Sequence, residues 1–146
     1  MARVTRRFDC PPDAVFDVLA DGWLFVAWVV GTARCRDVEQ HWPSVGARIH
    51  HSFGVWPALI DDTTTSLEWA PGRRAVFEAR GWPLGEARVE IDVRASGTGS
   101  VVRITEYPVR GPGRLLRPLL EPFLFVRNVE TLRRLREIVE GRHRSV

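Results

Sequence analysis

The sequence predicts an α+β fold in which a seven-stranded antiparallel sheet curves around a long C-terminal helix. Strand-like segments repeat at short spacing through the middle of the chain, with turn residues between them. Residues 124–140 instead follow the 3.6-residue period of an amphipathic helix. Because consecutive hairpins form a meander that normally buries one face, we expect this helix to cover that face.

Three short elements are expected before the meander. Residues 3–8 predict the first strand, and residues 10–22 predict a helix that starts at a pair of prolines and ends at Gly22. The Trp-rich residues 23–30 predict a second short helix or a buried turn.

The remaining strands are predicted from alternating apolar and polar residues and from the turns that separate them. The clearest hairpin turns are "PGRR" at 71–74 and "SGTGS" at 96–100. Residues 110–118 then break the sheet and lead into the long helix, which we expect to be interrupted at Pro118 or Pro122. The six predicted strands lie near 32–40, 46–54, 62–69, 74–80, 86–95 and 100–107.

The buried face of the C-terminal helix contains polar residues. With Leu135 at its centre, the helical period brings Leu124, Asn128 and Thr131 onto the same side. Burying an amide or hydroxyl without a partner costs roughly 1–3 kcal/mol. Either these groups bond to neighbouring protein, or they face a cavity between helix and sheet, and we expect Asn128 to help line such a cavity.

The composition indicates one domain, residues 1–146, and excludes several kinds of chemistry. All 21 basic residues are arginines, so Schiff-base chemistry and a phosphate-binding loop lysine are excluded. The arginines mix with acidic residues, which argues against nucleic-acid binding. Two cysteines and the absence of a long apolar run predict a cytoplasmic protein without stable membrane insertion.

Several motifs resemble those of the helix-grip, or START-like, SRPBCC superfamily, and in particular a mainly actinobacterial subfamily. The resemblance covers nearly the whole chain and implies a helix-grip fold with a deep hydrophobic cavity under the C-terminal helix. The superfamily includes polyketide cyclases/dehydrases and lipid-transport proteins. The motifs that carry it are "VFDVLADGW" (15–23), "WVVGTARCR" (28–36), "GARIHHSFGVWP" (46–57), "ARGWPLGEARVEI" (79–91) and "RNVETLRRL" (127–135).

Three residues are candidates for acid–base chemistry. Strand alternation places His51 on the cavity side and His50 outside, so the two cannot share a metal. His51 is either a general acid or base, or a core histidine bonded to a polar neighbour. Glu106 ends the last strand and would point inward as a proton carrier or as the partner of Arg127, or it would turn outward where the strand ends.

These observations leave three functions open. The first is binding of an apolar small molecule such as a lipid, isoprenoid or polyketide, and the second is a cyclase/dehydrase-type enzyme. In that enzyme His51 and Glu106 would move protons while Arg127 steadies an enolate. The third is an interaction module with a collapsed cavity. We expect no metal and no cofactor, and the oligomeric state is left open. The expected ligand-binding residues are Trp28, His51, Phe53, Trp56, Phe77, Trp82, Glu106, Leu124, Asn128 and Thr131.

Overall fold

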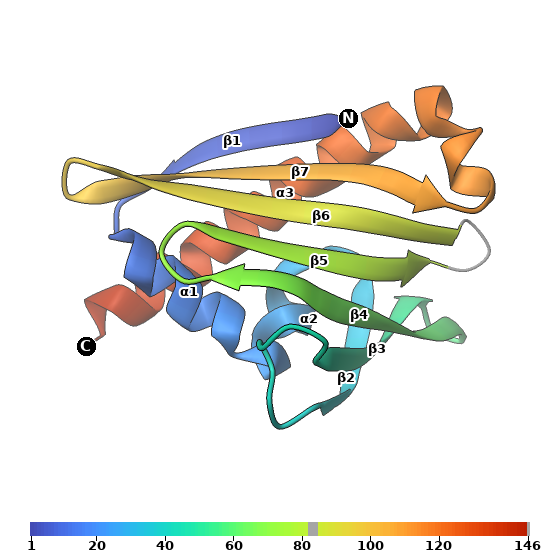
Figure 1. The fold of residues 1–146 in the computed structure, drawn as a ribbon, viewed down its shortest axis with the longest axis horizontal. Coiled ribbons are helices and arrows are strands. Elements are labelled where there is room, and N and C mark those ends of the chain that lie inside the picture. Colours follow the sequence, from blue (N-terminus) through green and yellow to red (C-terminus); the bar gives the residue numbers. More distant parts are fainter. Residues whose placement is uncertain (82–84, 146) are drawn as a thin grey trace.

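The computed structural model describes residues 1–81 and 85–145 and has the predicted α+β fold (Figure 1). One antiparallel sheet of seven strands is combined with a long C-terminal helix and short helices after the first strand. The elements in chain order are β1 (Ala2–Phe8), α1 (Pro12–Ala20), η1 (Gly22–Leu24), α2 (Phe25–Trp28), β2 (Thr32–Val38), β3 (Arg48–Val55), β4 (Ala58–Ala70), β5 (Arg74–Gly81), β6 (Gly85–Ser96), β7 (Gly99–Arg110), η2 (Pro112–Arg114) and α3 (Arg117–Arg144).

The strands follow one another across the sheet, except that the first strand lies beside the last. The order is β1-β7-β6-β5-β4-β3-β2, and every neighbouring pair is antiparallel. Ala2 is opposite Glu106 and Phe8 is opposite Ser100, so all of β1 pairs with residues 100–106 of β7. The predicted turn at residues 96–100 joins β6 to β7, with Ser96 opposite Gly99.

Helix α3 crosses one face of the sheet, as Figure 1 shows. Its C-terminal half buries Leu132, Leu135 and Val139 in the main core. The sheet contributes alternating residues to the same core, for example Ile91 and its neighbours of the same parity, whereas the residues between them carry charge. Removing these apolar side chains from water provides most of the free energy that holds helix and sheet together.

The predicted interruption of the C-terminal helix is wrong. Helix α3 runs continuously from Arg117 to Arg144, with Pro118 in its first turn and Pro122 inside it. A proline in the first turn loses nothing, because the amides of that turn have no partner within the helix. Pro122 removes a single helical hydrogen bond, to Pro118, and Pro118 is exposed to solvent.

The two halves of α3 have different surfaces. In the first half, Leu119, Phe123 and Val126 are 76%, 64% and 68% exposed. In the second half the exposed residues are polar or charged, and Arg133 forms ion pairs with Glu130 and Glu137. Among the helices that the structure describes, none combines the length and the apolar character needed to cross a membrane.

A cavity between the sheet and the first half of helix α3

A cavity of about 590 Å³ lies between the sheet and the first half of α3. Most of its wall is apolar and comes from α2, the segment that follows α2, the strands β3 to β7 and α3. Phe123 and Val126 line the cavity and are also exposed, so the cavity opens to solvent beside them. An open cavity of this volume contradicts the third alternative drawn from the sequence, a collapsed cavity.

His51 lies on the cavity wall, as strand alternation predicts. Its side chain is 3% exposed, it stacks on Phe25 with ring centroids 5.3 Å apart, and its Nε2 is 2.8 Å from Thr64 Oγ1. The Nδ1 atom is buried and has no hydrogen-bond partner within the described residues. Burial disfavours the charged imidazolium and lowers the pKa of His51 to about 4, so the ring is neutral at pH 7.

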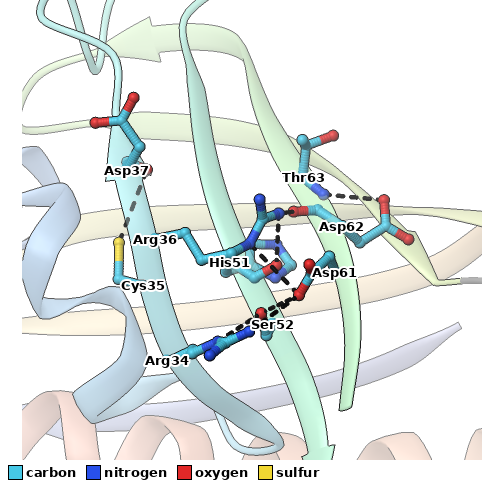
Figure 2. A network of polar contacts seen from close by, with 9 residues as sticks. All are labelled: Arg34, Cys35, Arg36, Asp37, His51, Ser52, Asp61, Asp62 and Thr63. Atoms are coloured by element: carbon cyan, nitrogen blue, oxygen red, sulfur yellow. Dashed lines mark hydrogen bonds and ion pairs between the residues drawn. The ribbon is translucent and has the colours of Figure 1, made fainter.

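The backbone around His51 is held from the opposite face of the sheet, as Figure 2 shows. Arg36 on β2 donates hydrogen bonds to the carbonyl oxygens of His51 and Asp62, both at 3.1 Å. One step along β3, Ser52 donates its hydroxyl to Asp61 and accepts a bond from Arg34. These contacts join three neighbouring strands and fix the position of the histidine that they carry.

Glu106 lies on β7, is 3% exposed, and receives hydrogen bonds from two residues of α3. The Arg127 guanidinium donates to both carboxylate oxygens, at 3.2 and 3.3 Å. The Asn128 amide donates to Oε1 at 3.0 Å. Two donors on one carboxylate match the rule that buried charges are paired and hydrogen-bonded. The interpretation of Glu106 as a partner of Arg127 is therefore the one that the contacts support.

Both polar residues on the buried face of α3 bond to neighbouring protein. Asn128 bonds to Glu106, although its Oδ1 atom has no partner among the described residues. The hydroxyl of Thr131 accepts a hydrogen bond from the Val30 amide at 3.3 Å, which ties α3 to the segment after α2. Neither residue belongs to the cavity wall, so the expectation that they line it is wrong.

The structure separates the predicted site residues into two groups. One group lies on the wall of the same cavity and consists of His51, Phe53, Glu106, Leu124 and Arg127. Three of the predicted aromatic residues do not line this cavity. A fourth, Trp82, is outside the described residues. Trp28 packs in the core against Phe25, Phe77 stacks on Trp42 at 5.3 Å, and Trp56 is 80% exposed at the β3–β4 turn.

Some residues of the wall are absent from the sequence-based predictions. Leu120, Phe123 and Val126 come from the first half of α3. The run "LLEPFLFV" (119–126) is apolar on nearly every side of a helix, and this is the signal that could have identified them. Two charged residues near the ends of β5 and β6, Arg80 and Glu86, also belong to the wall. Within residues 1–81 and 85–145, no cluster of three His, Cys, Asp or Glu side chains could hold a metal ion.

Comparison with known proteins identifies the family. The model of the family "Polyketide cyclase / dehydrase and lipid transport" matches residues 1–140. The chain belongs to this family. Membership confirms the SRPBCC resemblance that the sequence motifs carry. No curated protein has a sequence that matches the chain.

Solved structures with the same fold include members from several bacteria. Protein CV1439 from Chromobacterium violaceum has 20% identity and a TM-score of 0.71, with 94% of this chain and 96% of that chain covered. Protein NE0264 from Nitrosomonas europaea has 17% identity and a TM-score of 0.72, with 96% and 94% covered. The di-domain ARO/CYC StfQ from the steffimycin biosynthetic pathway has 14% identity and a TM-score of 0.76. The match covers 97% of this chain and 50% of StfQ. At these identities the likeness shows the fold alone.

Proposed function

We propose that the protein binds an apolar small molecule that carries an oxygen-containing polar group, and holds it without chemical change. The observation that carries this proposal is the cavity of about 590 Å³, whose wall is mostly apolar with a few polar and charged side chains. Cavities of about 300–1,000 Å³ with this character are typical small-molecule sites. Lipids, isoprenoids and polyketides all have the required apolar body.

Two polar groups on the wall would recognise the polar end of the ligand. Arg127 has a buried Nε–H without a partner among the described residues, although its terminal nitrogen is bonded to Glu106. The unpaired Nδ1 of His51 donates or accepts a hydrogen bond, depending on the tautomer. A carbonyl, carboxylate or hydroxyl oxygen on the ligand would satisfy these groups, which otherwise remain unpaired at a cost.

Acid–base catalysis of the cyclase/dehydrase type is the second candidate, because His51 and Glu106 are on the wall of the same cavity. Two observations favour binding instead. A pKa of about 4 leaves His51 as a neutral imidazole at pH 7, so no imidazolium is present to act as a general acid, and the ring is a weak base. Both oxygens of Glu106 are already bonded to Arg127. A histidine with this pKa is not poised near neutral pH, which general acid–base catalysis favours.

A fluorescent fatty acid such as parinaric acid tests the binding proposal. We expect saturable binding to the wild-type protein, and at least tenfold weaker binding to Leu124→Trp, because the indole would fill the cavity. Leu115→Trp, at an exposed position, is the matched control and should bind normally. No saturable binding by any variant, or equal binding by Leu124→Trp, would contradict the proposal.

Mass spectrometry separates binding from catalysis. The protein is purified under native conditions, its bound molecule is released and identified, and that molecule is incubated with fresh protein. Recovery of an unchanged molecule supports carriage. A new product that disappears in His51→Ala would establish the enzyme instead.

A further inference from the structure

A second surface feature surrounds the mouth of the cavity. Large apolar side chains are exposed on the β3–β4 turn, just after η2, and on the first turns of α3. Figure 1 shows these three segments at the same end of the molecule, on the right. We define the exposed apolar rim as Val55, Trp56, Leu115, Leu119, Phe123 and Val126.

The rim and the cavity are continuous. Phe123 and Val126 belong to both, and Gly54, which precedes Val55, is also on the cavity wall. Leu119, Phe123 and Val126 are spaced i, i+4, i+7 and so form one exposed stripe along α3. A contiguous apolar surface of this kind marks an interaction site, whereas single exposed apolar residues are ordinary.

Positive charge flanks this surface. Arg114 is exposed next to Leu115, and on the other side of α3, Arg3 and Arg6 of β1 form a groove with Phe125 and Val129. In the part of the chain that the structure describes, none of these three arginines has an ion pair. Nearby, Arg110 and Arg117 are paired with Glu86 and Glu121, so the acidic groups there are already neutralised.

The charge distribution selects among the possible occupants of the rim. In a symmetric dimer the same surface would meet itself, and Arg114 and its neighbours would face identical charges. A bilayer that contains anionic lipids would instead attract the arginines and accept the leucine, phenylalanine and tryptophan side chains at its interface. We therefore propose that this end of the molecule docks reversibly on an anionic membrane surface, with the cavity mouth toward the lipid.

Vesicle sedimentation of the full chain tests the docking. One set of vesicles contains phosphatidylcholine alone, and the other contains three parts phosphatidylcholine to one part phosphatidylglycerol. We expect binding to the second set that weakens at high salt, because exposed charges are screened. Leu119→Gln should weaken it about tenfold and Arg114→Gln about fivefold. The matched controls Val45→Gln and Arg94→Gln, exposed outside the rim, should change it less than about twofold.

Three outcomes would overturn the proposal. The first is the absence of binding to either set of vesicles, and the second is equal binding by Leu119→Gln and the wild type. The third is a wild-type dimer in sedimentation velocity that Leu119→Gln converts to a monomer while no vesicle is bound. The proposal goes beyond the ligand-binding function and can fail separately, because Leu124→Trp should lose ligand but still bind vesicles.

Discussion

The amide of Asn128 on α3 donates a hydrogen bond of 3.0 Å to Oε1 of Glu106 on β7, and both side chains are buried. This contact joins the helix to the sheet beside the cavity, because Glu106 is also part of the cavity wall. Asn128 is therefore a clamp between two elements, and its position on the apolar face of the helix has a structural reason.

Replacing Asn128 should destabilise the fold. We expect Asn128→Leu to cost about 1–3 kcal/mol, because one donor to a buried carboxylate is lost. The thermal unfolding midpoint should fall by several degrees. Glu137→Leu, at an exposed position on the same helix, is the control and should change stability by less than about 0.5 kcal/mol. An unchanged or higher midpoint for Asn128→Leu would mean that the amide is not a clamp.

The Arg127–Glu106 pair should behave as a coupled unit. Arg127→Met leaves a buried carboxylate without its cation, and we expect a loss near the lower end of about 3–5 kcal/mol, because Arg127 is partly exposed. Adding Glu106→Gln to Arg127→Met should recover most of the lost stability, because it removes the unpaired carboxylate charge. Urea unfolding of both single variants and the double variant measures the coupling free energy.

An exposed ion pair on the same helix provides the comparison for this double-mutant cycle. Arg117→Met disrupts the exposed pair with Glu121 and should cost less than about 1 kcal/mol. Additive effects of Arg127→Met and Glu106→Gln would show that the two side chains do not interact in solution.

His51 should make stability depend on pH. Its pKa is lowered from 6.5 to about 4 in the folded state, so between these values the unfolded state binds more protons. The contribution of His51 to the free energy of unfolding should therefore be fully present above pH 6.5 and should fall as the pH drops toward 4. The loss attributable to this residue is on the order of 3 kcal/mol.

Chemical unfolding at about pH 7 and about pH 5 measures this effect. His51→Gln cannot protonate and should lose less stability than the wild type over this interval. His143→Gln, at an exposed position on α3, is the matched control and should follow the wild type. Identical pH dependence in His51→Gln and the wild type would contradict the burial effect.

Thr131 should anchor the segment after α2. Thr131→Val keeps the shape but removes the acceptor for the Val30 amide, so we expect a loss of about 1–3 kcal/mol. Thr131→Ser retains the hydroxyl and should keep the bond. Hydrogen exchange at Val30 reads out the contact directly: faster exchange is expected in Thr131→Val, and equal exchange in the two variants would rule the bond out.

Strand alternation was sufficient to predict much of the site. The parity of β3 placed His51 on the buried side, and the parity of β7 did the same for Glu106. These assignments succeed because a strand has only two faces and one of them is covered. The pairing of Glu106 with Arg127 was one of three open alternatives, since strand alternation gives a direction but not a partner.

Parity could not show which buried side chains reach the cavity. Phe77 points to the covered face, but Trp42, from the segment between β2 and β3, packs on it and closes that region. The segment that carries Trp42 has no helical or strand periodicity from which its packing could be predicted. Trp56 adjoins Pro57 in a turn, where alternation no longer applies, and its side chain is exposed. The helical period also gave no direction for residues 119–126, because nearly every side of that stretch is apolar.

The pairing of β1 with β7 has a consequence for how the chain folds during synthesis. β1 is synthesised before the other strands of this sheet, yet the residue opposite Ala2 is Glu106 on β7. Contacts this distant in sequence slow folding, because the intervening loop must be closed before they form. Until then β1 has no strand beside it, and an unpaired strand edge is prone to aggregation. β1 therefore stays without its partner strand until β7 has been translated.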